Sequence, residues 1–477
     1  MNFQIPWNVY QQKHRYKSQA LYHALRDTIV SGSLPYESKL PSHRELADLY
    51  EVSRGVVAQV YDMLTAEGYL SSAVGRGTFV SYNHHHTPAP QPNTEPIQLS
   101  AWGRRLLEVP FRHLRNLAPA DIQYDFSIGR TDTSLFPYTE WNRTLYDSVR
   151  ALANGQRQEA FASAGHFPLR ESIARYLRRA RGIEADAEDV VIVNGSMQAI
   201  ALLAQLLVDP GDPVVVEDPC YRGIWQAIDA VGGTLLPSPV DAQGLRVDDW
   251  PSRLLFVTPS RQFPTGSVLS LQRRQEILHW AARRHAVIIE DDYDGEFRHS
   301  GRPIEPLKVL DHDDRVVYIG TFSKTMFSDI RIGYVVLPRW LNTPFTKAQH
   351  LYEPHPTSLL QQQAVCAFMN SGHYERHLRR MKRHYSKKHK LCSQALQEHL
   401  GHLFDFVEGD AGLHIFGWWK GTLEEYESLR QSCRAQGVVW SDAGSYTLQP
   451  DKTGGCFGFA HLTEDEILAG ILAIAAT

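Results

Sequence analysis

The sequence predicts a multidomain chain in which a small helical domain with a β-hairpin precedes a larger α/β domain that carries a smaller C-terminal α+β lobe. Three observations predict this class. Residues 17–80 hold three helical segments and a short stretch that alternates apolar and small polar residues. Residues 81–98 contain four prolines and no apolar periodicity. From residue 99 onward, short apolar strands alternate with helices, as in domains built on a parallel sheet.

The composition fits a folded protein with more than one core and excludes a small disulfide-stapled scaffold. The 477 residues are 43% hydrophobic and 21% charged, with a formal net charge of -4, so any nucleic-acid surface has to be local. The five cysteines include no CxxC pair, which argues against a zinc site and predicts a reducing, cytoplasmic location. No apolar stretch approaches the ~18 residues of a membrane span, so no membrane partner is expected.

Residues 1–80 are predicted to form a winged helix-turn-helix domain. Apolar residues recur with helical spacing over 18–29, and two more helices are expected after Ser42 and Ser53, which are both N-cap residue types. The predicted core positions of this domain are Leu46, Val56, Val60, Leu64 and Leu70.

The end of this domain is predicted to be a hairpin, followed by a linker. The stretch 68–82 alternates apolar and small polar residues around Gly75 and Gly77, as the wing of such a domain does. The proline-containing residues 81–98 form a semi-rigid linker. Three adjacent histidines at 84–86 are read as solvated, because neighbours in sequence do not readily share one tetrahedral metal.

Promoter DNA is the partner that a winged helix-turn-helix domain predicts. Residues 1–80 hold eight Lys or Arg and seven Asp or Glu, so affinity has to come from a few well-placed groups at helix starts and the wing tip. The candidate DNA-binding residues are Ser42, Arg44, Ser53, Arg54, Gln59 and Arg76. An ordinary solvated surface position is the alternative for each arginine.

The larger domain, residues 99–477, is predicted to contain a largely parallel central sheet, with a small lobe at about 374–477. Buried-strand candidates are 190–193, 214–217, 253–258, 286–291, 316–321 and 334–337, and helices are expected at 196–208 and 271–284. Residues 374–390 form a long basic helix. Either a solvated face of the lobe or a DNA contact explains it, and the solvated face is favoured.

The strand ends of the larger domain carry residues suited to carbonyl and phosphate chemistry. Lys324 follows a predicted buried strand, where a lysine can act as a Schiff-base amine. Asp291 ends another strand, where its carboxylate can pair with a ring nitrogen. The turn before Ser196 leads from a strand into a helix, which presents backbone N–H groups to a phosphate. Each feature alone is more often structural, but their order at strand ends favours a cofactor site.

That order resembles the fold-type I pyridoxal-phosphate enzymes of the aspartate aminotransferase superfamily. The segments that carry the resemblance include VVYIGTFSKTMFSDIRIGYVVL, IIEDDYDGEF, VIVNGSMQAIALL and TPSRQFPTG. Together with PYESKLPSHRELADLYEVSRGVVAQVYDMLTAEGYL, they resemble the MocR subfamily of GntR-type bacterial regulators over nearly the whole chain. The resemblance implies pyridoxal 5'-phosphate as cofactor, a homodimer, and a domain that senses a small molecule and generally does not turn over substrate.

The resemblance also implies a role for each residue of the cofactor site. Lys324 would form the covalent link to the cofactor, and Asp291 would contact the pyridine nitrogen. Tyr293 would contact the phenolic oxygen, and Tyr221 would stack on the ring. The phosphate would be held by Arg331, Ser196, the backbone around Met197, and Thr321 or Ser323. A packed core aromatic is the alternative for Tyr221, and a plain ion-pair partner is the alternative for Arg331.

Three departures from the family pattern bear on function. Arg261 stands where the family has a histidine, and Ser328-Asp329 replaces a common Pro-Gly. Cys456 stands where a family arginine binds a substrate carboxylate, so that clamp is missing unless Arg261 replaces it. The predicted effector is therefore pyridoxal phosphate itself or a small amine-type compound. The alternative interpretation is a catalytically active aminotransferase with a DNA-binding appendage.

Overall fold

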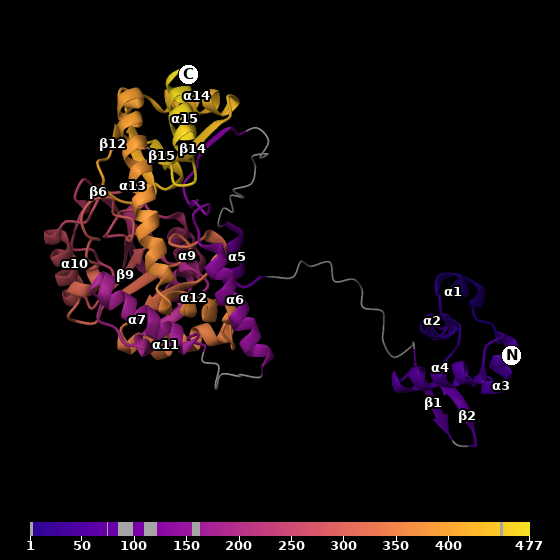
Figure 1. The fold of residues 1–477 in the computed structure, drawn as a ribbon. Helices are drawn as coiled ribbons and strands as arrows, with labels where there is room; N and C mark the ends of the chain where they lie inside the picture. The colour runs from indigo at the N-terminus through magenta and orange to yellow at the C-terminus, as the bar shows by residue number, and fades with distance from the viewer. Residues whose placement is uncertain (1–2, 74, 84–98, 109–121, 155–162, 449–451) are drawn as a thin grey trace. The chain divides into compact units, whose positions relative to one another are not determined.

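The structure is a computed structural model that describes residues 3–73, 75–83, 99–108, 122–154, 163–448 and 452–477. The chain divides into two compact units, Met1–Gln98 and Leu99–Thr477, each with its own hydrophobic core (Figure 1). Of the predicted linker 81–98, only residues 81–83 are among the described ones.

The first unit is a cluster of helices closed by a hairpin. Its elements are α1 (Trp7–Lys13), α2 (Lys17–Val30), α3 (His43–Leu49), α4 (Arg54–Ala66), β1 (Leu70–Ala73) and β2 (Gly77–Val80). The three predicted helices are α2, α3 and α4, and the predicted wing is the antiparallel pair β1–β2. The structure adds α1, whose seven residues are too few to show a period and whose buried Trp7 packs on Tyr50.

Side-chain caps determine where α3 and α4 begin. Ser42 Oγ accepts the Glu45 backbone N–H (3.3 Å), while the Glu45 carboxylate accepts the Ser42 backbone N–H (2.8 Å), which makes a capping box. Ser53 Oγ accepts the Val56 backbone N–H (3.3 Å). These bonds satisfy backbone donors that a helix start otherwise leaves without partners.

The core of the first unit differs from the prediction at one position. Leu46, Val60, Leu64 and Leu70 are buried as predicted. The prediction for Val56 is met only in part: Val57 takes the fully buried position on α4, while Val56 is half-buried and packs against the edge of the core. The buried residues of this helix are Val57, Val60, Tyr61 and Leu64. They follow i, i+3, i+4, i+7 spacing, and Val56 lies at the border of that stripe.

The second unit is built on an eight-stranded sheet. Its strands are β4 (Val190–Val193), β5 (Pro213–Asp218), β6 (Thr234–Asp241), β7 (Gly244–Leu245), β8 (Leu254–Val257), β9 (Val287–Asp292), β10 (Val316–Thr321) and β11 (Gly333–Val336). Their spatial order is β4-β11-β10-β9-β8-β5-β6-β7. All six predicted strands are present, and the sheet is largely parallel as predicted, with β11 and β7 running antiparallel to their neighbours.

Helices cover both faces of this sheet. They are α5 (Ala101–Glu108), α6 (Tyr138–Ala153), α7 (Phe167–Arg181), α8 (Ser196–Leu207), α9 (Arg222–Val231), α10 (Leu271–Arg284), α11 (Arg339–Tyr352) and α12 (Leu359–Asn370), with short 3-10 turns η3 (Ala187–Asp189), η4 (Leu307–Leu310) and η5 (Ser328–Ile330). Alternate strand residues point to opposite faces: Val191 and Val193 pack in the core with α8, whereas Val190 and Ile192 pack in the core with α7 and α12. Strands β4 and β8 are therefore buried along their whole length and consist of apolar residues, whereas β6 is partly exposed.

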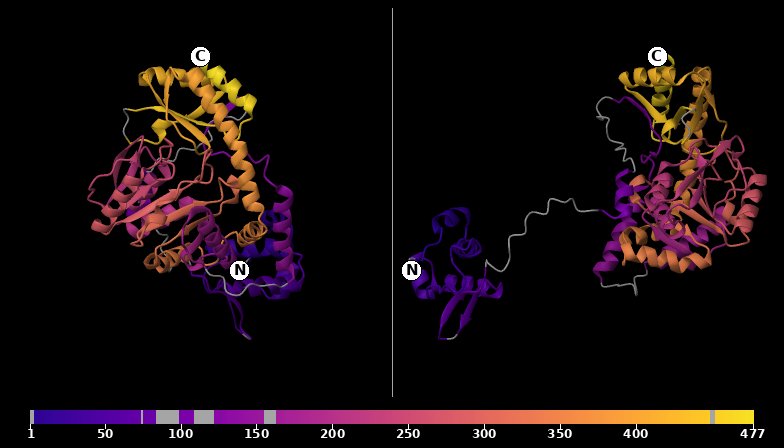
Figure 2. Two further views of the ribbon diagram at one scale, coloured as in Figure 1. Left: turned by 60° about the vertical axis from the view of Figure 1, so that its left-hand side comes forward. Right: turned by 180° about the vertical axis from the view of Figure 1, so that it is seen from behind.

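A smaller five-stranded sheet forms the C-terminal lobe. The elements of this part are β3 (Tyr124–Phe126), α13 (His373–Leu400), β12 (Phe404–Phe406), β13 (His414–Trp419), α14 (Leu423–Ala435), β14 (Val438–Asp442), η6 (Ala443–Ser445), β15 (Gly454–Gly458) and α15 (Glu464–Ala475). Strand β3 pairs parallel with β14, so this sheet takes one strand from outside 374–477. The long helix α13 runs from the lobe along the helices of the larger sheet (Figure 2). No helix in the described part of the chain has the length and apolar character needed to cross a membrane.

Candidate functional site

The residues predicted for the cofactor lie at one edge of the eight-stranded sheet. Strands β5, β8, β9 and β10 run parallel, and β11 is antiparallel to both β10 and β4, so the carboxyl ends of β4, β5, β8, β9 and β10 share this edge. Asp291 lies opposite Ile319 of β10, and Thr321 lies opposite Gly333 of β11. From β9 to β4 there are three strand spacings, about 14 Å. In open α/β sheets this edge is the usual ligand site.

Lys324 lies on the loop that follows β10. Its Nζ donates a hydrogen bond to the carbonyl oxygen of Gly129 (2.7 Å). Burial lowers the pKa of this amine from its ordinary value, and the Arg331 guanidinium lowers it further, against an opposing effect of Asp294. A lowered pKa increases the fraction of neutral amine, which is the nucleophilic form.

Asp291 is a buried carboxylate that lacks a partner. Its Oδ1 has no hydrogen bond among the described residues, although the side chain lies inside the protein. Burial, followed by the like charges of Asp292 and Asp294, raises the pKa of Asp291 to about 7. A buried acceptor without a donor is unfavourable, so this group suits a ligand that brings an N–H.

Tyr293 follows the same strand and points its hydroxyl at Arg261. Arg261 Nη1 donates to Tyr293 Oη (2.6 Å) and to Asp294 Oδ2 (3.1 Å). Burial raises the pKa of Tyr293 well above its ordinary value, so the hydroxyl keeps its proton. That proton remains available for a ligand oxygen, since the bond from Arg261 uses only an acceptor position on the hydroxyl.

Helix α8 and Arg331 together form a cradle for an anion. Gly195, with φ of 88°, turns the chain from β4 into α8, and no bond within the described residues uses the backbone N–H groups of Ser196 and Met197. Arg331 donates from Nη2 to the Asn194 carbonyl oxygen (3.4 Å). A Cβ added at Gly195 would lie 2.8 Å from Arg331 Nη2, so the guanidinium lies directly against the turn.

Two hydroxyls complete the same side of the site. Thr321 Oγ1 accepts the Ser323 backbone N–H (3.1 Å). The Ser323 hydroxyl is buried and has no partner among the described residues. The sequence analysis did not predict Asn194, whose carbonyl oxygen accepts the bond from Arg331. Its place directly before Gly195 was the only signal in the sequence.

Tyr221 is the N-cap residue of α9 and is half-buried. Its ring meets Phe263 edge-on, with centroids 5.8 Å apart and an interplanar angle of 88°. Burial raises the pKa of the Tyr221 phenol; the Asp291 charge raises it further and the Arg331 charge lowers it. Asp291 and Arg331, which are both predicted cofactor contacts, therefore lie close enough to Tyr221 to shift its pKa.

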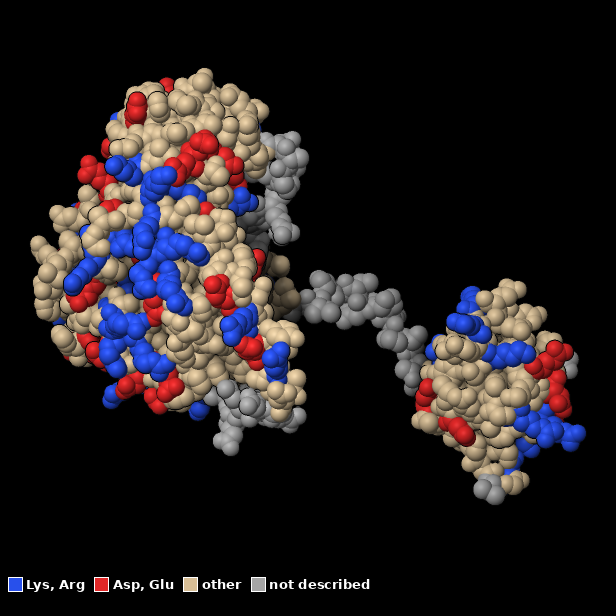
Figure 3. All heavy atoms as spheres, viewed as in Figure 1, with Lys and Arg blue, Asp and Glu red and all other residues tan. Residues whose placement is uncertain are grey.

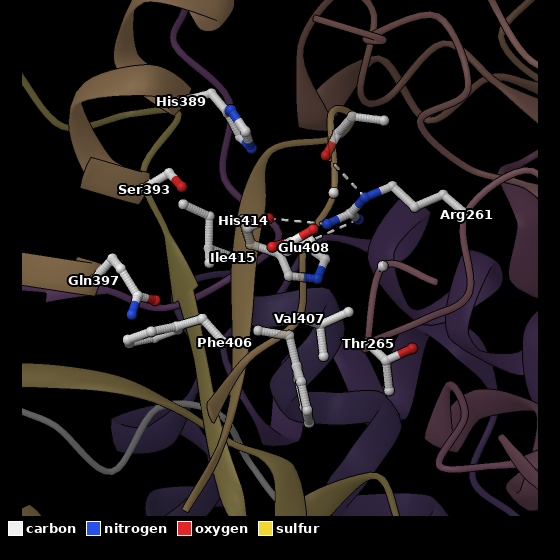
Figure 4. Close-up of a pocket in the computed structure, with 14 residues that line it drawn as sticks. Arg261, Thr265, His389, Ser393, Gln397, Phe406, Val407, Glu408, His414 and Ile415 are labelled. Atoms are coloured by element: carbon white, nitrogen blue, oxygen red, sulfur yellow. Dashed lines mark hydrogen bonds between the residues drawn. The ribbon is translucent and has the colours of Figure 1, made fainter. Parts of the chain in front are cut away.

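Arg261 uses most of its N–H donors in bonds inside the protein, and Figure 4 shows it among the residues that line a pocket. Besides its bonds to Tyr293 and Asp294, Nε donates to the Ala411 carbonyl oxygen (3.0 Å) and Nη2 donates to the His414 carbonyl oxygen (2.9 Å). A cavity of about 200 Å³ lies beside it, between the loop at Thr265 and Gly266 and the C-terminal lobe. The bonds from Arg261 to the Ala411 and His414 carbonyl oxygens were not predictable, because these residues lie about 150 positions away in the sequence.

Cys456 is fully buried in strand β15. It packs in a small cluster with Phe416 and Ala443, and Tyr446 lies against that cluster. Burial raises the pKa of its thiol far above the ordinary value, so no charge is available at this position. A neutral thiol in apolar surroundings does not replace the two donors that an arginine offers a carboxylate.

The predicted DNA-binding residues divide into two groups. The hydroxyls of Ser42 and Ser53 are engaged as helix caps. Arg44 is exposed and lies 4.0 Å from Asp48. The other predicted residues are exposed and have no side-chain bond among the described residues: Arg54, Gln59 and Arg76. The sequence analysis did not name Lys39, which the structure places beside the wing. Its backbone forms an antiparallel β-bridge with Phe79, and its Cε would lie 2.9 Å from a Cβ added at Gly77.

Comparison with known proteins follows the same division. Residues 122–474 match the aminotransferase class I and II family, and residues 17–80 match the bacterial regulatory proteins of the gntR family. Over 463 residues the chain is 35% identical to the probable rhizopine catabolism regulatory protein MocR of Rhizobium meliloti, with 94% of this chain and 91% of that one covered. Over 377 residues it is 29% identical to the HTH-type pyridoxine biosynthesis transcriptional regulator PdxR of Corynebacterium glutamicum, with 78% and 77% covered.

A solved structure shows the fold of the larger unit. The Pyrococcus horikoshii kynurenine aminotransferase, in complex with PMP, superposes with a TM-score of 0.69 and 24% identity, covering 80% of this chain and 94% of that chain. Fold and site thus define a winged helix-turn-helix regulator with a fold-type I aminotransferase-like unit. The chain belongs to the MocR group of GntR-type transcriptional regulators, whose larger domain is of aminotransferase class I and II.

The comparisons confirm pyridoxal phosphate as the predicted cofactor, and the residues present fit it. The partnerless Asp291 oxygen suits a ring N–H, and the helix start at Gly195 with Arg331 suits a phosphate. When bound, this cofactor supplies an aldehyde that captures amines and a ring that withdraws electrons.

Proposed function

We propose that residues 99–477 form a sensor domain that holds pyridoxal phosphate at the sheet edge and passes its occupancy to a DNA-binding domain, residues 1–80, through the linker 81–98. The observation that carries this proposal is the buried Asp291 oxygen without a partner, on the strand beside the one that leads to Lys324. A group of this kind is costly to keep unless a ligand uses it.

Each residue of the site then has one task. Lys324 attaches the cofactor, supported by its lowered pKa, and Asp291 receives the ring N–H. Tyr293 donates to the phenolic oxygen, and Tyr221 covers one face of the ring. The phosphate contacts are Arg331, Ser196, the Met197 backbone, Thr321 and Ser323.

The same site favours sensing over turnover. A transaminase has to hold the carboxylate of its amino acid, and Cys456 offers no charge for that task. Arg261 does not replace the missing clamp, because Tyr293, Asp294 and two backbone carbonyls take four of its five N–H donors, and a carboxylate clamp needs two. The effector is therefore pyridoxal phosphate itself, or a small amine that does not depend on this carboxylate contact.

Promoter DNA is the partner of the first unit, through the exposed Arg54, Gln59 and Arg76 and the capped helix starts of α3 and α4. A homodimer fits this task, because paired half-sites one helical turn apart match a two-fold symmetric protein. A regulator of this kind works on DNA in the cytoplasm.

A spectral titration with a panel of amino acids and amines, run beside promoter binding, tests the proposal. We expect negligible conversion of common amino acids in the presence of keto acids, because the lost arginine–carboxylate pair weakens their binding about 30- to 1000-fold. Tight binding of an ordinary amino acid followed by turnover would instead establish the enzyme. The panel includes one matched pair, an amino acid and the amine that lacks only its carboxylate. The difference in affinity between these two compounds gives the contribution of the carboxylate to binding.

A further inference from the structure

Helix α13 has one buried face and one strongly basic face. The buried face packs into the lobe and against the larger sheet's helices through Tyr374, His377, Met381, Tyr385, Lys388 and Cys392. The opposite face carries the residues that we name the α13 basic stripe: Arg376, Arg379, Arg380, Arg383, Lys387 and Lys390. All six are exposed.

The stripe is continuous along the helix. Apart from the adjacent Arg379 and Arg380, successive members are three or four residues apart. They therefore lie on one side of α13 over 14 residues, or about 21 Å. Figure 3 shows lysine and arginine atoms gathered on the face where α13 runs in Figure 1.

Acidic groups leave most of this charge unneutralised. Lys387 pairs with Glu464 (2.7 Å), while Arg376 and Arg380 donate to backbone carbonyls. Arg379, Arg383 and Lys390 have no ion pair or hydrogen bond among the described residues.

The stripe does not serve the stability of the helix. The pairs 376/380, 379/383 and 383/387 place like charges four residues apart, where they repel each other. A basic surface that costs helix stability and carries few acidic partners is suited to an external polyanion.

We propose that the α13 basic stripe binds the phosphate backbone of DNA that flanks the site held by the first unit, a proposal that rests on the proposed function. Duplex DNA carries one charge per about 1.7 Å of axis, so a 21 Å stripe faces the backbone of about six base pairs. Arginine forks bind phosphate oxygens bidentately and read no sequence. Residues 81–98 span at most about 60 Å, which keeps the flanking duplex near this surface and raises its effective concentration.

The test compares two full-length variants on two duplexes. The stripe variant is Arg379→Gln/Arg383→Gln/Lys390→Gln. The control variant, Arg246→Gln/Lys347→Gln/Arg434→Gln, removes the same charges from exposed positions on other elements. One duplex contains the promoter site alone, and the other adds about 30 base pairs on each side. Affinity is measured by fluorescence anisotropy between 50 and 300 mM salt, at fixed pyridoxal phosphate.

The stripe variant is expected to bind the long duplex roughly 100-fold more weakly than wild type at 0.1 M salt, with a log–log salt slope about 2 to 3 units less steep. The control variant is expected to keep the wild-type values, and both variants are expected to bind the short duplex normally. The variant Arg379→Lys/Arg383→Lys keeps the positive charges and should retain most of the wild-type affinity for the long duplex.

Equal loss in the stripe and control variants, or no loss in either, would overturn the stripe as a DNA surface. Loss that is equal on short and long duplexes would also overturn it, because the stripe would then act through folding or the first unit. Failure of the proposed function has a different signature, namely no specific binding of either duplex by the wild-type chain.

Discussion

At the scale of single residues, Asp291 is the position where folding and cofactor binding conflict most. Its unfolded carboxyl ionises near 3.8, whereas in the folded chain burial and the nearby Asp292 and Asp294 raise the pKa to about 7. Between these values the folded state binds a proton that the unfolded state has released. The contribution of Asp291 to the free energy of unfolding is therefore fully present below about pH 4, and it is lost as the pH rises from there through about 7.

Asp291→Asn should remove this loss. Between pH 4 and pH 8 we expect the cofactor-free variant to gain about 2 to 4 kcal/mol in free energy of unfolding relative to wild type, because the amide never ionises. The same change should weaken pyridoxal phosphate binding. Urea unfolding at a series of pH values gives the first quantity, and a spectral titration gives the second. A difference between variant and wild type that does not change with pH would contradict the assignment.

Lys324→Ala should abolish covalent attachment of the cofactor, because we propose that Lys324 supplies the amine of that link. After borohydride treatment of the loaded protein, peptide mass analysis is expected to find the pyridoxyl group on Lys324 in the wild type and none in the variant. A label retained on another lysine would show that the attachment site is assigned wrongly.

Arg331→Ala should weaken binding of the cofactor phosphate by about 1.5 to 3 kcal/mol, because a charge-assisted contact is lost.

The sequence predicted the chemistry of these residues better than their partners. Lys324 and Asp291 were found because Lys324 follows one apolar strand and Asp291 lies at the end of another, and the ends of parallel strands meet at one edge. The Gly129 carbonyl that binds Lys324 and the lobe carbonyls that bind Arg261 lie 150 to 195 residues away, where local pattern carries no information. The question of whether Arg261 takes over the carboxylate clamp therefore required the structure.

At the scale of elements, the start of α4 separates stability from recognition. Ser53 caps the helix and the adjacent Arg54 is exposed without a partner, so the two side chains serve different purposes. In fragment 1–98, a compact unit with its own core, Ser53→Ala should cost about 1 kcal/mol of unfolding free energy and Arg54→Ala close to none.

Promoter binding is expected to rank the same two variants differently. Arg54→Ala in the full chain should cost on the order of 1 to 3 kcal/mol if it contacts a base, with the effect concentrated at one position of the operator. Arg76→Ala at the wing should weaken binding less selectively. A purely structural role for Arg54 would appear instead as lost stability in the fragment.

Element types were predictable where their patterns were strong, and element directions were not. The apolar runs at 190–193 and 316–321 are strands with the predicted bounds. The reversed direction of β11 and the recruitment of β3 into the small sheet depend on tertiary pairing, which periodicity does not encode. Helix α1 is held by burial of Trp7, and its seven residues hold less than two full turns of pattern.

At the scale of the whole molecule, two compact units divide the work. Deleting residues 1–80 is expected to abolish specific promoter binding and to leave cofactor uptake intact, since the second unit contains every proposed cofactor contact. Anisotropy with the promoter duplex and the visible spectrum of the truncated protein measure both. Specific promoter binding by the truncated chain would place DNA recognition outside the first unit.

We propose that cofactor occupancy at Lys324 controls DNA binding. The most direct measurement is the promoter affinity of wild type and of Lys324→Ala, each titrated with pyridoxal phosphate. We expect the cofactor to shift wild-type affinity by about 5- to 150-fold, which is the usual range of coupling between two sites, and to leave the affinity of the variant unchanged. Identical affinities of the wild type with and without pyridoxal phosphate, at full occupancy of the site, would contradict it.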